Sequence, residues 1–217
     1  MYSRRELAWL SSRGWEAAID RAQPGQREAI EQWRRQDWPA IVRRADADLE
    51  PGQVSLGIPV PPSSDGVKGR IALNVLKADV ARHSLPLALA DAAQAAPERW
   101  HAPLAELVTR SSGLALRAYG SLAMQAITGQ PYLTPASDID LLFAPSDMAS
   151  LHEGLLLLEQ YSAQLPLDGE IVFPSGAAVA WKEWLGAAPM QSRVLVKDAG
   201  AVRLASIAEL TATLEAA

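Results

Sequence analysis

Two aspartates on a short apolar segment are the residues of this chain whose type and spacing best suit a catalytic or metal-binding role. Asp138 and Asp140 lie two positions apart, and Ile139, Leu141 and Phe143 occupy the alternate positions. Residues two apart in a β-strand point to the same face, so the carboxylates project together while the apolar side chains pack. An unpaired carboxylate on a buried strand is costly, so such a pair faces solvent or holds a cation. We interpret it as a Mg²⁺ site, because Mg²⁺ takes hard oxygen ligands and keeps several waters.

A Gly-Ser turn lies upstream of the aspartates. Gly120 and Ser121 separate a predicted strand, 114–119, from a predicted helix, 122–128. Gly120 permits a tight turn and a close approach of ligand to backbone, and Ser121 is placed to cap the helix. The free N–H groups at a helix start favour an anion, and Arg117 is a further candidate phosphate ligand. A phosphate cradle beside a metal pair predicts phosphoryl or nucleotidyl transfer.

A second acidic pair follows downstream. Asp168 and Glu170 lie on a predicted strand, 167–173, and share one of its faces. If this strand lies beside 138–143, one of the two acids can complete a three-carboxylate site for two metal ions. We favour Asp168, which is nearer the loop, but Glu170 stays open. The alternative is a turn aspartate and an edge-strand glutamate without catalytic roles.

The residues around Asp138 and Asp140, and not the spacing of the pair, indicate a functional site. Asp46 and Asp48 have the same spacing as the first pair but continue into Pro51 and Gly52, so we interpret them as part of a solvated turn.

Two basic residues are further candidates for phosphate contacts. Lys182 lies between two tryptophans, and the alternative for it is a surface pair with Glu183. Arg43 is adjacent to Arg44 on a predicted strand, where neighbours point oppositely, so at most one of them reaches a given site.

Composition narrows the class of protein. Hydrophobic residues make up 49% and charged residues 21% of the 217 positions, as in an ordinary globular protein. The absence of cysteine excludes disulfides and thiolate metal sites, and fits a cytoplasmic location. No apolar window reaches membrane-spanning length, and the net charge of −5 argues against nucleic-acid binding. We therefore expect neither a membrane nor a nucleic acid as partner.

The remaining pattern predicts an α+β fold, with a small α+β domain over 1–80 and a catalytic domain over 81–217. Helices are expected over 3–12, 24–36, 85–95, 98–111, 122–128, 147–161 and 206–215. Strands are expected over 40–44, 53–58, 68–77, 114–119, 138–143, 167–173, 177–181 and 193–197.

The central run of the sequence resembles a known family. Residues 119–129, 132–134 and 137–142 are similar to the MdcG family, the phosphoribosyl-dephospho-CoA transferases that act as holo-acyl-carrier-protein synthases of malonate decarboxylase. The resemblance extends to 168–170, 180–183, 39–44 and 56–59. The family belongs to the nucleotidyltransferase superfamily, whose pattern is Gly-Ser, then Asp-x-Asp, then a third acid. The resemblance therefore implies a nucleotidyltransferase-like mixed sheet flanked by helices.

The resemblance also implies a reaction. A serine of the malonate decarboxylase acyl-carrier protein would attack the α-phosphate of 2′-(5-triphosphoribosyl)-3′-dephospho-CoA, releasing diphosphate. Asp138, Asp140 and Asp168 would hold Mg²⁺, and Asp168 or Glu170 would orient the second ion or accept the serine proton. Gly120 and Ser121 would bind the β- and γ-phosphates.

Two other functions remain open on the sequence. One is a different Mg²⁺-dependent nucleotidyltransferase that uses ATP. The other is a non-catalytic module that binds the carrier or assists assembly.

Overall fold

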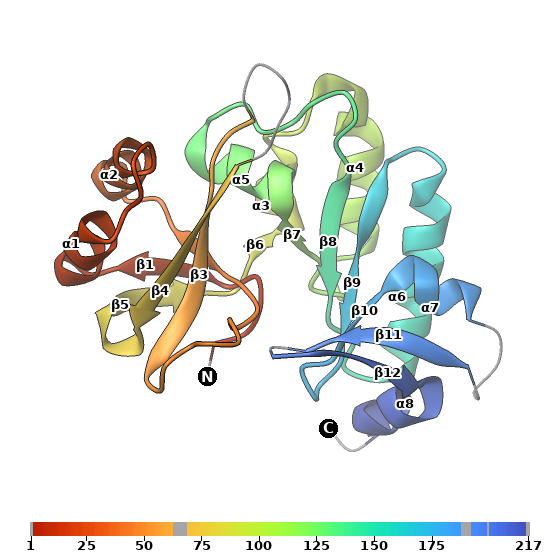
Figure 1. Ribbon diagram of the computed structural model, residues 1–217. Coiled ribbons are helices and arrows are strands. Elements are labelled where there is room, and N and C mark those ends of the chain that lie inside the picture. Colours follow the sequence, from red (N-terminus) through yellow and green to blue (C-terminus); the bar gives the residue numbers. More distant parts are fainter. Residues whose placement is uncertain (1, 63–68, 188–191, 199, 216–217) are drawn as a thin grey trace. The chain divides into compact units, whose positions relative to one another are not determined.

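The chain forms two compact units in the computed structural model, which describes residues 2–62, 69–187, 192–198 and 200–215 (Figure 1). Unit 1 comprises Met1–Pro86 with Gln130–Tyr132, and unit 2 comprises Leu87–Gly129 with Leu133–Ala217. Residues 81–86 belong to unit 1 because β5 (Val80–Ser84) pairs with β1 (Leu7–Leu10). The division therefore comes after residue 86, whereas the boundary predicted from the sequence follows residue 80.

Unit 1 is an antiparallel sheet with two helices. The strands are ordered β4-β3-β2-β1-β5. Besides β1 and β5, they are β2 (Ala40–Val42), β3 (Gln53–Pro59) and β4 (Arg70–Leu76), and a short 3₁₀ turn, η1 (Lys77–Asp79), precedes β5. The helices are α1 (Ser12–Asp20) and α2 (Arg27–Arg35). Residue 68, the first of one predicted strand, lies outside the described residues.

The helix predicted over 3–12 is wrong. Leu7–Leu10 is a strand that pairs with β2 on one side and β5 on the other. Leu7, Ala8 and Leu10 are all buried, so this short run is apolar at consecutive positions, a pattern that a buried strand and a buried helix share. The helix begins only after Ser11, whose Oγ accepts a hydrogen bond from the Gly14 N–H at 3.2 Å.

Unit 2 is a mixed seven-stranded sheet with helices, so the predicted α+β class and mixed sheet are confirmed. Its strands are ordered β12-β11-β10-β9-β8-β7-β6, and β8 and β9 pair in parallel. They are β6 (Leu87–Ala88), β7 (Arg117–Tyr119), β8 (Ile139–Phe143), β9 (Leu167–Val172), β10 (Ala178–Ala180), β11 (Arg193–Lys197) and β12 (Val202–Ser206). The helices are α3 (Leu89–Ala93), α4 (Glu98–Arg110), α5 (Gly120–Thr128), α6 (Met148–Ser162), α7 (Trp181–Gly186) and α8 (Ile207–Glu215).

One face of this sheet is packed against helices. Ile139, Leu141 and Phe143 of β8 are buried in the core, and α4 and α6 lie side by side on the same side of the sheet (Figure 1). Gly154 lets α6 come close, because a Cβ there would collide with the ring of Phe143. The residues between these apolar positions point to the opposite face, where the predicted site residues lie. None of the helices described is long and apolar enough to cross a membrane.

Candidate active site

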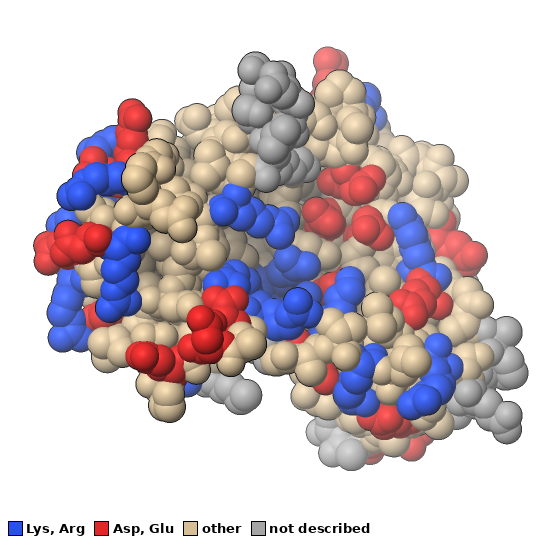
Figure 2. Space-filling model, viewed as in Figure 1, with Lys and Arg blue, Asp and Glu red and all other residues tan. Residues whose placement is uncertain are grey.

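Three of the predicted carboxylates, Asp140, Asp168 and Glu170, lie in two rows across one face of the unit 2 sheet. Tyr119, Asp140 and Asp168 stand opposite one another on β7, β8 and β9. Arg117, Leu142 and Glu170 form the next row. Residues opposed on neighbouring strands point to the same face, so both rows share one surface. In Figure 2, acidic side chains gather over β8 and β9 with basic side chains beside them.

The Gly-Ser turn and the Asp-x-Asp strand meet at Gly120 and Asp140. Helix α5 begins at Gly120 directly after β7, and Gly120 has a φ of +66°. A Cβ at Gly120 would lie 3.0 Å from Cγ of Asp140 and collide with its carboxylate, so a larger residue here must displace that side chain. The first N–H groups of α5 therefore start beside this carboxylate. The structure brings together these two motifs, which lie twenty residues apart in the chain.

The predicted capping role of Ser121 is wrong. The helix starts two residues earlier than expected, so its N-cap is Tyr119 and Ser121 is the second helical residue, with only 7% of its surface exposed. The other end agrees with the sequence. Gly129 ends the helix in the left-handed conformation, with φ of +68°.

Asp138 precedes β8 and is exposed. A turn fixes the chain just before it, because Ser137 Oγ accepts a hydrogen bond from the Thr134 N–H at 2.9 Å. The N–H of Ile139 then donates to the carbonyl of Pro166 at 2.8 Å, which brings the start of β8 alongside the approach to β9. Asp138 thus stands at the solvent end of the strand that carries Asp140.

Asp168 is paired with Lys182. Lys182 Nζ lies 3.6 Å from Asp168 Oδ1, and both side chains are about half exposed. Trp181 and Trp184 are buried on either side of Lys182 and fix α7, which follows β10 without a loop. Glu183 does not pair with Lys182; its Oε1 accepts a hydrogen bond from the Leu195 N–H at 2.7 Å. Lys182 therefore lies within reach of the carboxylate row, and its contact with phosphate stays a prediction.

Glu170 has a different environment. Its side chain is only 4% exposed, and Lys197 Nζ donates to its Oε1 at 3.1 Å. A carboxylate buried to this extent is stabilised by such an ammonium group. The alternative of an edge-strand glutamate does not fit, because β9 lies between β8 and β10. Lys197 was not predicted from the sequence. The alternation of β11 could show only which residues share its face, and the pairing with Ala178 on β10 brings Lys197 to the face that carries Glu170.

The carboxylates do not form a metal cage of their own. Among the described residues, no group of three or more His, Cys, Asp or Glu side chains is placed to hold a metal ion. Mg²⁺, however, is usually held by one or two carboxylates together with waters and substrate phosphates. Asp138 and Asp140, with Asp168 opposite, supply oxygen donors of that kind at a helix start suited to phosphate. The residues fit an ion that arrives with its phosphate substrate.

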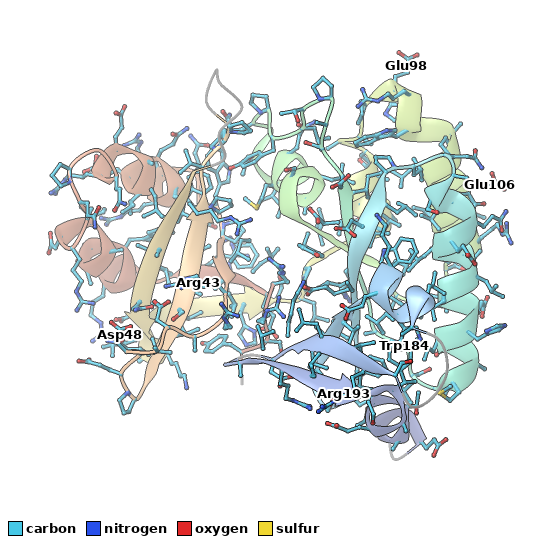
Figure 3. All side chains as sticks on the ribbon, turned by 45° about the vertical axis from the view of Figure 1, so that its right-hand side comes forward. Arg43, Asp48, Glu98, Glu106, Trp184 and Arg193 are labelled. Atoms are coloured by element: carbon cyan, nitrogen blue, oxygen red, sulfur yellow. The ribbon has the colours of Figure 1, made fainter. Side chains whose placement is uncertain are left out.

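Arg43 is held within unit 1 (labelled in Figure 3). Its guanidinium donates to both carboxylate oxygens of Asp46, and its Nε donates to the Leu56 carbonyl at 3.0 Å. Asn74 Nδ2 adds a hydrogen bond to Asp46 at 3.1 Å. The hydrogen bond from Arg43 lowers the pKa of Asp46 below its ordinary value. Asp46 is therefore an ion-pair partner and not the solvated turn residue that its sequence context predicted, while a phosphate contact by Arg43 stays a prediction.

Comparison with known proteins gives the family. The model of the phosphoribosyl-dephospho-CoA transferase MdcG C-terminal domain matches residues 88–208, and that of the MdcG N-terminal domain matches residues 3–86. The chain belongs to the MdcG family. The resemblance drawn from the sequence is thereby confirmed, and with it the class of enzyme, a transferase.

Curated relatives of the MdcG family agree. A phosphoribosyl-dephospho-CoA transferase of Xanthomonas campestris pv. campestris (strain 8004) is 37% identical over 208 residues, which cover 94% of each chain. One from Bradyrhizobium diazoefficiens is 38% identical, covering 90% of this chain and 86% of the relative. One from Pseudomonas putida (strain GB-1) is 34% identical, covering 76% and 78%. No solved structure gives a significant match.

Proposed function

We propose that this enzyme transfers the phosphoribosyl-dephospho-CoA group of 2′-(5-triphosphoribosyl)-3′-dephospho-CoA to a serine of the acyl-carrier protein of malonate decarboxylase, with release of diphosphate. The observation that carries the proposal is the close approach of Gly120, at the start of α5, to Asp140, with Asp168 opposite on β9. A helix start that suits a polyphosphate stands beside carboxylates that suit Mg²⁺. The family match supplies the identity of the transferred group.

The start of α5 binds the β- and γ-phosphates in this proposal. Backbone N–H groups at Gly120 and Ser121 point along the helix axis, and the helix dipole favours the negative charge that diphosphate carries as it leaves. Arg117, on the strand that leads into this helix, supplies a further positive charge on the same face. Lys182 approaches from the other side of the carboxylate row.

Asp138 and Asp140 hold Mg²⁺ in this proposal. The ion, when bound, offsets the charge that develops on the phosphate oxygens. Asp168 is the third carboxylate that we favour, because it stands opposite Asp140 and half of its side chain is accessible. It accepts the proton of the attacking serine or orients a second ion. Glu170, buried against Lys197, positions that lysine.

A comparison of donors tests the function. Purified enzyme is incubated with Mg²⁺, the carrier protein, and either the triphosphoribosyl donor or ATP, and diphosphate release is measured. We expect release with the triphosphoribosyl donor that depends on the carrier and none above background with ATP. Release with ATP but not with the triphosphoribosyl donor would identify an ATP-dependent nucleotidyltransferase instead. No release with either donor would favour the non-catalytic module. The proposed location is the cytoplasm, which the lack of cysteine fits.

A further inference from the structure

The hairpin of β11 and β12 has two different faces. Val194, Val196 and Ala205 are buried in the core of unit 2, on the side of α8. The opposite face carries three large apolar side chains that are exposed: Leu195 at 39%, Val202 at 45% and Leu204 at 52%. We call these three residues the hairpin patch. Single exposed leucines are ordinary, but contiguous ones mark interaction sites.

The patch is contiguous because of the register of the hairpin. Leu195 stands opposite Leu204, and Val202 stands opposite Lys197. Side chains so opposed lie about 5 Å apart on one face. Arg193 and Lys197 lie two positions before and after Leu195 on that face, so a cation flanks each end of the patch. Figure 3 labels Arg193 on this hairpin, and Figure 2 shows uncharged surface over β11 and β12 with both basic and acidic side chains around it.

The same sheet face leads from the patch to the carboxylates. Lys197 borders the patch and also donates to Glu170, the neighbour of Asp168 along β9. Strands in a sheet are about 4.8 Å apart, so β11 lies about 15 Å from β8, three strands away. A protein that presents a serine to the Asp140 row from this face extends over β10 and β11.

We propose that the hairpin patch docks the carrier protein, through an apolar side chain near the acceptor serine that is flanked by carboxylates. This rests on the proposed function. The apolar centre matches an apolar anchor, and Arg193 and Lys197 match acidic neighbours. Three side chains and two cations are too few for the area of a permanent dimer, and suit a protein that must leave after each turnover. The carrier protein, and not a second copy of this chain, is therefore the occupant.

The test compares two leucines of equal exposure. Leu204→Glu places a negative charge in the patch, while Leu156→Glu makes the same change on α6, where the leucine is also 52% exposed. We expect Leu204→Glu to raise the KM for the carrier protein at least about tenfold and leave the KM for the donor unchanged. Leu156→Glu should change neither. Titration of each variant with unmodified carrier in the absence of donor should show the same loss of affinity.

The other possible outcomes separate failure of the docking proposal from failure of the proposed function. If the wild type modifies the carrier and Leu204→Glu does so with an unchanged KM, the docking proposal is overturned while the function stands. If the wild type modifies no carrier, the function itself fails. If light scattering shows that Leu204→Glu dissociates a dimer and carrier affinity is unaltered, the patch is a self-association surface and the proposal is overturned. Leu204→Gln, which keeps the size without a charge, should weaken carrier binding less and serves if the glutamate variant unfolds.

Discussion

Asp140 on β8 lies directly opposite Asp168 on β9, in a pair of parallel strands. Their backbones are about 4.8 Å apart, so the two carboxylates stand side by side on one face. Like charges this close repel one another, and Lys182 lies beside Asp168. A cation bound between these oxygens, as in the proposed function, would relieve that repulsion.

Gly120 and Gly129 provide a matched pair of substitutions. Both have a positive φ, +66° and +68°, at the two ends of α5, but only a Cβ at Gly120 meets the Asp140 carboxylate. Each alanine variant should lower the free energy of unfolding by about 1–2 kcal/mol, the cost of the left-handed conformation. Gly120→Ala should also lower kcat at least about 100-fold, since it displaces the carboxylate or the helix start. Equal activity of the two variants would contradict a catalytic role for this contact.

Asp168 and Glu170 should separate into a catalytic and a structural residue. Asp168→Asn should abolish transfer and change the free energy of unfolding by less than about 1 kcal/mol, because its pair with Lys182 is exposed. Lys197→Met leaves the buried Glu170 carboxylate without this ammonium group and should destabilise the fold by about 1–3 kcal/mol. Urea unfolding and transfer assays of both variants check the assignment. A stable, inactive Glu170→Gln beside an active Asp168→Asn would reverse it.

Lys182 should contribute to binding of the donor and not to the stability of the fold. Lys182→Met removes a half-exposed cation from the carboxylate row, so its stability should stay within about 0.5 kcal/mol of the wild type. If the ammonium group contacts phosphate, the KM for the triphosphoribosyl donor should rise about tenfold while the KM for the carrier is unchanged. Lys182→Arg keeps the charge and should restore much of the donor affinity. An unchanged donor KM in the methionine variant would remove Lys182 from the site.

The Arg43–Asp46 pair should make the stability of the fold depend on pH. The hydrogen bond from Arg43 lowers the pKa of Asp46 below its ordinary value of 3.8, so the folded state binds this proton less readily than the unfolded state. The stabilisation is thus fully present above the unfolded pKa and is lost as the pH falls through the lowered, folded pKa. Asp46→Asn should cost about 1 kcal/mol at pH 7 and progressively less below pH 4. Urea unfolding at several pH values measures this, and a pH-independent difference would contradict it.

The sequence predicted the elements that carry the candidate site residues better than it predicted the start of the N-terminal unit. Alternating apolar and acidic residues identified β8 and its two faces, and the position of Gly129 identified the end of α5. The consecutive apolar residues of Leu7–Leu10 have no period that separates a strand from a helix, and pairing with two neighbouring strands decided for a strand.

Pairings between residues far apart in the chain could not be predicted from local sequence patterns. β12 was missed because Val202–Ser206 is mostly exposed and gains its order from the hairpin with β11. The pairing of Glu170 with Lys197 joins residues 27 positions apart, which only the order of β9, β10 and β11 reveals. The pairing of β8 with β9 also brings Asp168 opposite Asp140. From the sequence, this proximity could be predicted only if the two strands were assumed to be neighbours.

The most direct test of the proposed reaction is the intact mass of the carrier protein. Carrier is incubated with Mg²⁺, the triphosphoribosyl donor, and either wild-type enzyme or the Asp140→Asn variant, whose fold is checked by circular dichroism. The wild type should add one phosphoribosyl-dephospho-CoA group to a single serine, and the variant should leave the carrier unmodified. A carrier that stays unmodified with the wild type, or near-normal modification by a folded Asp140→Asn variant, would contradict the account.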